Sequence, residues 1–304
     1  MKTNLTLTLA PEIAFDETIF HQHIKNYLQI RDENNFSVRL LKRNIDARSR
    51  NIKVNIQADV YIDENPPSLL QFKNEYEDVS NQRQCIIVGA GPAGLFAALR
   101  LIELGIKPVI IERGKDVQER RRDLANINKK NIVNENSNYC FGEGGAGTYS
   151  DGKLYTRSKK RGDIHRILEI LVAHGAHENI LVEAHPHIGT NKLPKLIQEI
   201  RNTILKYGGE IHFNTKVVDF IVEGNEMKGV VTQSSDASHA LSSEHHHALQ
   251  ESHNAHCDIN NASLQQHKGI GVILATGHSA RDIFELLHHK NILIEAKPFA
   301  LGVR

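Results

Sequence analysis

The sequence predicts an α/β fold in which a Rossmann-type domain is preceded by a small ferredoxin-like α+β domain. Glycines spaced Gly89-x-Gly91-x-x-Gly94 stand between a strand-like run and a helix-like run, as in dinucleotide-binding domains. After Arg83, strand and helix patterns alternate, which is typical of parallel α/β sheets. Before it, a β-α-β-β order forms half of a ferredoxin-like fold.

The small N-terminal domain is expected over residues 1–64. Leu5, Leu7 and Leu9 alternate with threonines, which predicts a half-buried strand. A polar segment then separates two further strand-like runs. The helix and the two strands that complete this domain are expected at residues 16–30, 36–41 and 52–62.

A linker is expected at residues 65–82, because the paired prolines Pro66 and Pro67 continue neither a helix nor a strand. The second domain is expected over 83–304. Its helices are predicted at 92–104, 164–174 and 193–207. Its strands are predicted at 86–88, 109–111, 211–213, 217–222, 228–231 and 271–275.

Residues 232–268 form a stretch rich in Ser, His, Asn and Gln with few large apolar side chains. Such a composition cannot bury enough surface to order itself, so we expect an inserted loop between two strands. Its histidines and Cys257 raise the alternative of a metal site, but the paired ligand spacing of a structural zinc site is missing. We predict no metal site. The histidines are His239, His245, His246, His247, His253, His256 and His267.

The composition is that of an ordinary soluble globular protein, with 304 residues, 40% of them hydrophobic, and a formal net charge of +1. Nothing in that balance points to nucleic acid or an anionic membrane. Three scattered cysteines fit a reducing compartment better than a disulfide framework. The N-terminus has a strand pattern in place of a signal peptide, and no apolar run approaches a membrane span. We therefore expect a cytoplasmic protein.

Each glycine of the motif has a physical role. Gly89 permits a tight turn, Gly91 lets the backbone approach a pyrophosphate, and Gly94 lets the helix pack on the strand. The next strand ends on Glu112, at the spacing expected for a carboxylate that binds ribose hydroxyls. Because a carboxylate there disfavours a 2′-phosphate, we expect an ADP moiety without that phosphate.

Two later stretches bear on the choice between FAD and NAD, which the glycine motif alone does not separate. The run FGEGGAGTYSDGKL carries five glycines between Gly142 and Gly152, and such backbone can present consecutive N–H groups to a phosphate or a flavin edge. Further on, a buried strand ends in Ala275-Thr276-Gly277.

These stretches, with PHIGTNKL and ATGHSARD, resemble the FAD-dependent dehydrogenase family of bacterial NAD(P)/FAD-dependent oxidoreductase-like flavoproteins. Such proteins have a glutathione-reductase-type FAD domain, and members of this family place a small α+β domain before it. The resemblance implies FAD as cofactor and hydride transfer through flavin N5. It also implies a further FAD motif that does not occur before Arg304, so we expect the domain to be incomplete at its C-terminus.

The resemblance also implies roles for individual residues. Gly89, Gly91 and Gly94 would surround the FAD pyrophosphate, Glu112 the adenosine ribose, and Arg113 would lie near the adenosine part. Val217 would meet the adenine through its backbone, while Thr276 and Gly277 would close the pyrophosphate side. The ribityl–flavin portion would be lined by Gly144, Gly145, Ala146, Ser150, Asp151, Lys153 and Leu154.

No catalytic residue is assigned. Lys153, His278 and Cys140 are candidates that each have an ordinary structural explanation. The substrate is expected to be a small molecule, with NAD(P)H as a candidate electron donor, and neither nucleic acid nor membrane as a partner. The alternatives are an inactive flavoprotein fragment or a non-catalytic module that binds a nucleotide or RNA. For RNA, the N-terminal domain carries a basic stretch, but it lacks stacking aromatics on its strands. The basic residues are Arg39, Lys42, Arg43, Arg48, Arg50 and Lys53.

Overall fold

The computed structural model describes residues 1–31, 35–68, 70–154, 156, 162–189, 191–234 and 264–297. The chain divides into two compact units. One unit combines Met1–Glu75 with Tyr149–Leu196, and the other combines Tyr76–Thr148 with Ile197–Arg304. Each unit is described by itself below.

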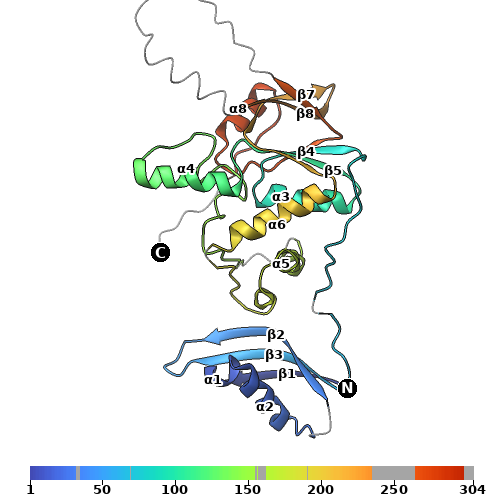
Figure 1. The fold of residues 1–304 in the computed structure, drawn as a ribbon, viewed down its shortest axis with the longest axis vertical. Helices are drawn as coiled ribbons and strands as arrows, with labels where there is room; N and C mark the ends of the chain where they lie inside the picture. Colours follow the sequence, from blue (N-terminus) through green and yellow to red (C-terminus); the bar gives the residue numbers. More distant parts are fainter. Residues whose placement is uncertain are drawn as a thin grey trace, which may run out of the picture. The chain divides into compact units, whose positions relative to one another are not determined.

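The first unit begins with a three-stranded sheet in the order β1-β3-β2, with both neighbouring pairs antiparallel. Strand β3 therefore lies between β1 and β2, which is the split β-α-β arrangement of a ferredoxin-like half. The helix at Glu17–Tyr27 covers one face of this sheet (Figure 1). Leucines on alternate positions of β1 pack with Phe20 and Ile24 of this helix. The elements are β1 (Lys2–Leu9), α1 (Pro11–Ala14), α2 (Glu17–Tyr27), β2 (Phe36–Asp46) and β3 (Lys53–Ile62).

A segment distant in sequence pairs with strand β2 in the same unit. The N–H of Arg43 donates to the carbonyl of Val182 at 2.8 Å, and the N–H of Ala184 donates to the carbonyl of Arg43 at 3.0 Å. This segment follows α5 (Ile164–Ala173) and the 3-10 helix η1 (Glu178–Leu181). Each compact unit is made of two separate segments of the sequence, whereas the predicted domains are continuous. The predicted boundaries at 1–64, 65–82 and 83–304 therefore stay a prediction.

The second unit is built on a parallel sheet in the order β10-β4-β5-β6. Strands β4, β5 and β6 run outward in sequence order, and β10 returns to the other side of β4. This is the start of the Rossmann order 3-2-1-4, so the predicted fold class is confirmed. The strands are β4 (Gln84–Val88), β5 (Lys107–Ile111), β6 (Glu210–His212) and β10 (Val272–Leu274).

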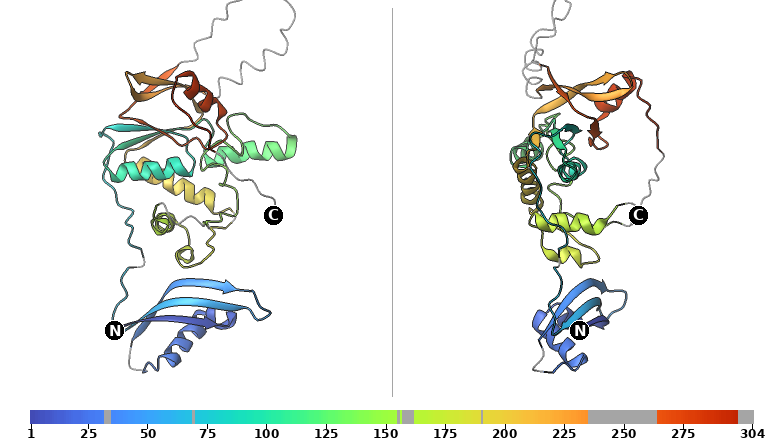
Figure 2. Two further views of the ribbon diagram at one scale, coloured as in Figure 1. Left: turned by 180° about the vertical axis from the view of Figure 1, so that it is seen from behind. Right: turned by 90° about the vertical axis from the view of Figure 1, so that its right-hand side faces the viewer.

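Both faces of this sheet are covered. Helices α3 (Pro92–Glu103) and α6 (Leu193–Lys206) lie on the same side of it (Figures 1 and 2). On the opposite face, Ile86 and Val88 pack with Val217 and with Ile283. Those partners come from the antiparallel sheet β7-β8-β9 and from helix α8. The elements are β7 (Thr215–Glu223), β8 (Glu226–Ser234), β9 (Gln265–Lys268) and α8 (Arg281–His289).

The sequence did not predict helices α4 (Val117–Lys130) and α8, nor strand β9. Helix α4 has few apolar residues, but Asp116 caps it by accepting from the N–H groups of Gln118 and Glu119 at 2.8 and 2.9 Å. Strand β9 corrects the expected loop at 232–268, because Gln265 to Lys268 pair with the edge of β8. The other histidines of that stretch, with Cys257, lie outside the described residues.

The described residues contain neither a membrane-spanning helix nor a cluster of metal ligands. None of their helices is long and apolar enough to cross a bilayer. They also contain no group of three His, Cys, Asp or Glu side chains that could hold a metal ion.

Candidate functional site

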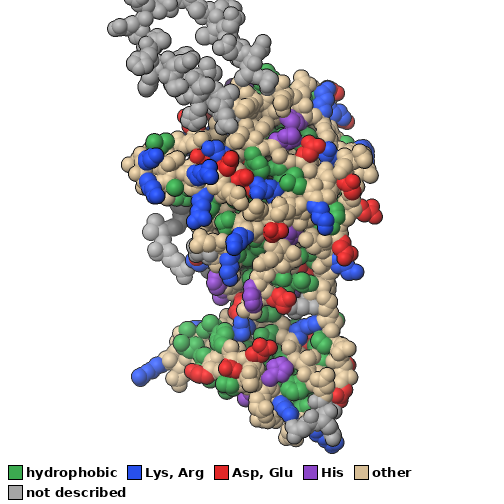
Figure 3. Space-filling model, in the orientation of Figure 1, with side chains coloured by type: hydrophobic (Ala, Val, Ile, Leu, Met, Phe, Trp, Pro, Cys, Tyr) green, Lys and Arg blue, Asp and Glu red, His purple; other side chains and the backbone are tan. Residues whose placement is uncertain are grey.

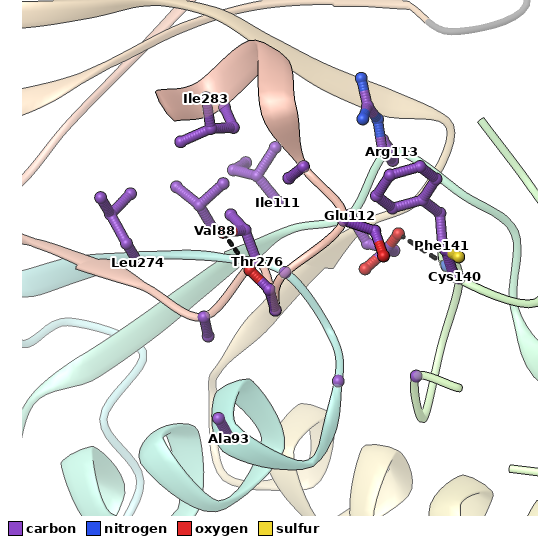
Figure 4. Close-up of a pocket in the computed structure, with 18 of the residues that line it drawn as sticks. Val88, Ala93, Ile111, Glu112, Arg113, Cys140, Phe141, Leu274, Thr276 and Ile283 are labelled. Carbon is purple, nitrogen blue, oxygen red and sulfur yellow. Dashed lines mark hydrogen bonds between the residues drawn. The ribbon is translucent and has the colours of Figure 1, made fainter. Parts of the chain in front are cut away.

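A pocket of about 360 Å³ lies at the carboxyl ends of β4, β5 and β10 (Figure 4). Its volume is in the range of small-molecule sites. The chain leaves β4 toward β5 on one side and reaches β10 on the other, so the pocket sits where the strand order reverses. In open α/β sheets, ligands bind at this kind of switch point.

The glycine turn after β4 forms the floor of the pocket. Gly89 has φ +107°, and a Cβ there would lie 2.6 Å from the carbonyl oxygen of Ala275. A Cβ on Gly94 would overlap the carbonyl oxygen of Gly89. Gly91 is the N-cap of α3, and no described side chain caps this end. The first N–H groups of the helix therefore remain available to an anion in the pocket.

Glu112 connects three backbone turns beside the pocket. Its buried carboxylate accepts hydrogen bonds from the N–H of Ala90 at 2.8 Å, of Gly114 at 2.8 Å and of Gly142 at 3.1 Å. A carboxylate has about four lone-pair sites, so capacity remains for a ligand hydroxyl. Its predicted role at a ribose stays a prediction, and the structure adds a role in shaping the pocket wall.

The glycine-rich loop that follows is organised by Arg120 of α4, whose side chain is completely buried. Its guanidinium donates to the carbonyls of Asn138 at 2.9 Å, Glu143 at 2.7 Å and Gly145 at 2.9 Å. The hydroxyl of Thr148 also donates to the carbonyl of Gly145, at 2.9 Å. The conformation of this loop therefore depends on one buried cation that sequence analysis did not identify.

Glu143 lies within the same loop and is also completely buried. Its Oε2 accepts from the N–H of Val117 at 2.9 Å and lies 3.2 Å from Nη1 of Arg201. Its Oε1 has no hydrogen-bond partner among the described residues. Burial raises the pKa of this carboxyl from 4.5 to about 7, against the opposing effects of Arg201 and the Val117 N–H.

The raised pKa of Glu143 predicts a pH dependence of stability. Between pH 4.5 and about 7 the folded chain retains a proton that the unfolded chain has released, so this contribution to stability falls as pH rises. Relative to Glu143→Gln, the wild type should lose about 2–3 kcal/mol between pH 5 and pH 8. Urea unfolding at both pH values measures this difference. Glu119→Gln, at an exposed position of α4, should reproduce the wild-type dependence, and equal slopes for all three proteins would contradict the assignment.

The segment after β10 forms the opposite wall. The N–H of Ala275 donates to the carbonyl of Val88 at 2.8 Å, which places this segment against the end of β4. Thr276, Gly277 and His278 line the pocket. The apolar part of the wall comes from Ile283 together with Val88, Ile111 and Leu274 (Figure 4).

The structure brings most of the predicted site residues together, but not all of them. Gly94 and Gly144 lie behind the pocket surface, where they contact the backbone of Gly89 and the side chains of Thr148 and Ile197. Ser150, Asp151, Lys153 and Leu154 belong to the first compact unit, so their predicted role at the ribityl–flavin portion stays a prediction. The predicted residues that line the pocket are Gly89, Gly91, Glu112, Arg113, Gly145, Ala146, Val217, Thr276 and Gly277.

The comparison with protein families agrees with this geometry. Residues 82–131, which include the glycine turn and Glu112, match the family described as FAD binding domain. The chain carries an FAD-binding domain. The predicted kinship with FAD-binding flavoproteins and the predicted cofactor, FAD, are confirmed by this match. Residues 1–61 match a domain of unknown function (DUF8436).

One curated protein and several solved structures are similar to longer parts of the chain. An uncharacterized protein of Clostridium beijerinckii is 31% identical over 319 residues, covering 99% of this chain and 53% of its own length. This chain therefore spans about half the length of that curated relative. Thermovibrio ammonificans THI4 is 17% identical with a TM-score of 0.41, covering 69% of this chain and 64% of its own. Bacillus halodurans glycerol-3-phosphate dehydrogenase, complexed with FAD, is 12% identical with a TM-score of 0.37, and the match covers 68% of this chain and 37% of the dehydrogenase chain.

The residues of the pocket fit the adenosine diphosphate part of the cofactor. At the glycine turn, Gly91 lines the pocket, and the atom nearest to an added Cβ there is the Cα of Gly145 at 4.0 Å, so the backbone at this position is open to a ligand. The open N-terminus of α3 supplies hydrogen-bond donors and a favourable dipole for a pyrophosphate. The apolar wall beside Ile283 offers a surface for a flat ring.

Proposed function

We propose that this chain is the cofactor-binding part of an FAD-dependent oxidoreductase of the dehydrogenase type. The observation that carries the proposal is the open N-terminus of α3, which faces a pocket edged by a buried carboxylate, Glu112, at the end of the next strand. That arrangement lies within the segment that matches the FAD binding domain. When bound, FAD would supply hydride transfer at its flavin N5.

The chain's own residues would bind and orient the cofactor. The N–H groups at the start of α3 would hold the pyrophosphate, with Gly91 keeping the approach open. Glu112 would bind the ribose hydroxyls, and Val217 and Ile283 would contact the adenine. Thr276 and Gly277 would close the wall opposite. A small-molecule substrate and NAD(P)H as electron donor are part of the proposal, and its catalytic residues are unassigned.

The proposal is tested by purifying the chain without added cofactor and recording its visible spectrum. We expect a flavin band, or its appearance after reconstitution, with FAD released on denaturation. Anaerobic addition of NADH or NADPH then tests the oxidoreductase assignment through bleaching of that band. A colourless protein that also fails to take up FAD would overturn the proposal.

Replacing Glu112 with alanine should weaken FAD binding by at least about tenfold, because a ribose contact is lost. Stability should also fall by at least about 3 kcal/mol, since three buried backbone N–H groups lose their acceptor. Fluorescence titration with FAD and thermal unfolding measure the two effects. Glu199→Ala, at an exposed position of α6, should change neither. Unchanged flavin occupancy in Glu112→Ala would show that the ribose assignment is wrong.

A non-catalytic RNA-binding module is the alternative from another functional class. On the face shown in Figure 3, basic and acidic side chains are interspersed. Two of the N-terminal basic residues are in ion pairs, Arg43 with Glu183 and Arg48 with Asp46. A salt-sensitive mobility shift of labelled RNA in a gel would favour the RNA-binding module. The absence of a mobility shift at low salt would rule it out.

A further inference from the structure

Two cationic side chains line the edge of the pocket, and one carboxylate behind them binds both. Arg113 follows β5 and Lys216 lies on β7, and both belong to the pocket lining. Asp282, in the first turn of α8, does not line the pocket. Its Oδ1 lies 3.3 Å from Nη1 of Arg113, and its Oδ2 accepts a second bond from the same guanidinium. The same Oδ2 lies 3.2 Å from Nζ of Lys216.

The contacts around Arg113 fix its orientation. Its guanidinium lies 4.5 Å from the centre of the Phe141 ring, and Figure 4 shows the two side chains next to each other. The two bonds to Asp282 hold the other side of the guanidinium in a fork geometry. The Arg113 side chain is only 15% exposed. It therefore has little freedom to turn toward a ligand while Asp282 is in place.

Asp282 carries a negative charge at neutral pH. Burial acts to raise the pKa of its carboxyl, but hydrogen bonds and charge from Arg113 and Lys216 outweigh burial and hold the pKa below its ordinary value. Two cations, Arg113 and Lys216, thus line the pocket edge, and both are paired with the Asp282 carboxylate behind them. This edge therefore offers no unpaired cation to an additional phosphate.

The pairing of Arg113 and Lys216 with Asp282 matters for nucleotide choice, because an arginine near the adenosine ribose accommodates a 2′-phosphate in related folds. We propose that Asp282 is a positioning residue that sets nucleotide selectivity. By engaging Arg113 and Lys216 it withholds both cations from a 2′-phosphate, so the pocket accepts adenine dinucleotides with a free 2′-hydroxyl. This inference rests on the proposed function, since it requires an adenosine diphosphate group in the pocket.

The test compares two ligands that differ only in that phosphate, ADP-ribose and 2′-phospho-ADP-ribose. Each is titrated against the FAD-loaded full chain, and displaced FAD is followed by the return of flavin fluorescence. The wild type should prefer ADP-ribose. In Asp282→Asn the preference should shift toward 2′-phospho-ADP-ribose by on the order of tenfold, because two charge-assisted bonds to the new phosphate become available.

Two further variants separate selectivity from damage to the fold. Asp219→Asn removes a carboxylate that is paired with Lys290 at 2.8 Å but does not line the pocket, and it should keep the wild-type preference. Adding Lys216→Met to Asp282→Asn should reverse much of the shift. Thermal unfolding of each variant, monitored by circular dichroism, identifies any loss of structure.

The outcomes distinguish this inference from the proposed function. If the wild type binds FAD and ADP-ribose but Asp282→Asn, folded, keeps the wild-type ratio, the role of Asp282 is wrong and the FAD site stands. If Asp282→Asn does not fold, Asp282→Ser takes its place: an unchanged ratio in folded Asp282→Ser would contradict the role, and a shift toward 2′-phospho-ADP-ribose would support it. If the wild type binds neither ligand nor FAD, both proposals fall.

Discussion

Replacing Arg120 with methionine should abolish FAD retention and lower the free energy of unfolding by at least about 3 kcal/mol. The buried guanidinium donates to the carbonyls of Asn138, Glu143 and Gly145, and the single hydroxyl of Thr148 could replace it at only one of the last two. An unsatisfied buried acceptor costs ~1–3 kcal/mol. The loop from 138 to 148 would then rearrange to reach water, which removes one wall of the pocket.

The matched control for this change is the neighbouring Arg121→Met, since Arg121 is exposed on the same helix. It should keep both the stability and the flavin. The stability and flavin content of Arg120→Lys should lie between those of the wild type and Arg120→Met, because an ammonium has three donors where the guanidinium has five. Absorbance at the flavin band and urea unfolding measure both properties. A stable, flavin-containing Arg120→Met protein would show that the loop holds its shape by other means.

Replacing Gly94 with alanine should destabilise the second unit by at least about 3 kcal/mol, at the upper end for overpacking. The new Cβ would overlap the carbonyl oxygen of Gly89, and backbone on both sides prevents a simple side-chain adjustment. Helix α3 would have to move away from β4, which displaces the N–H groups expected to bind the pyrophosphate. Thermal unfolding and FAD titration should therefore both show large losses.

Two other glycines give the contrast that makes this result interpretable. At Gly271 an added Cβ meets no atom within 4 Å, so Gly271→Ala should behave as wild type. At Gly91 the nearest atom is 4.0 Å away, so Gly91→Ala should fold normally. That Cβ would occupy the approach to the pyrophosphate, however, and FAD affinity should fall at least about tenfold. Equal effects of Gly91→Ala and Gly94→Ala on stability would contradict these separate roles.

Sequence reasoning succeeded where the signal is local. The strand before Gly89, the helix that begins after Gly91 and the carboxylate at the end of β5 follow from hydrophobic pattern and glycine spacing. Helix α8 also had a readable pattern, because Ile283 and Leu287 are four positions apart and both buried. That spacing was a signal that the sequence-based prediction did not use.

The rest depends on tertiary contacts that no local pattern reveals. Arg120, Arg121 and Arg122 are consecutive and identical in type, yet only Arg120 of the three is buried. Its position, three residues after the buried Val117 and four before Leu124, would have marked it once α4 was assigned as a helix. The link from Arg113 to Asp282 spans 169 positions, and neither residue type nor spacing indicates it.

The strand order also has a consequence for the sequence of events in folding. Gln84, at the start of β4, bonds to Lys268, which is 184 positions away, and β10 follows directly to pair with β4. Contacts at such separation form slowly, because the entropy of closing a long loop opposes them. During synthesis the glycine turn and α3 emerge long before the wall at Ala275 to Ile283. At the proposed site, capture of the nucleotide would therefore be a late event, and it would then stabilise the closed sheet through ligand binding to the native state.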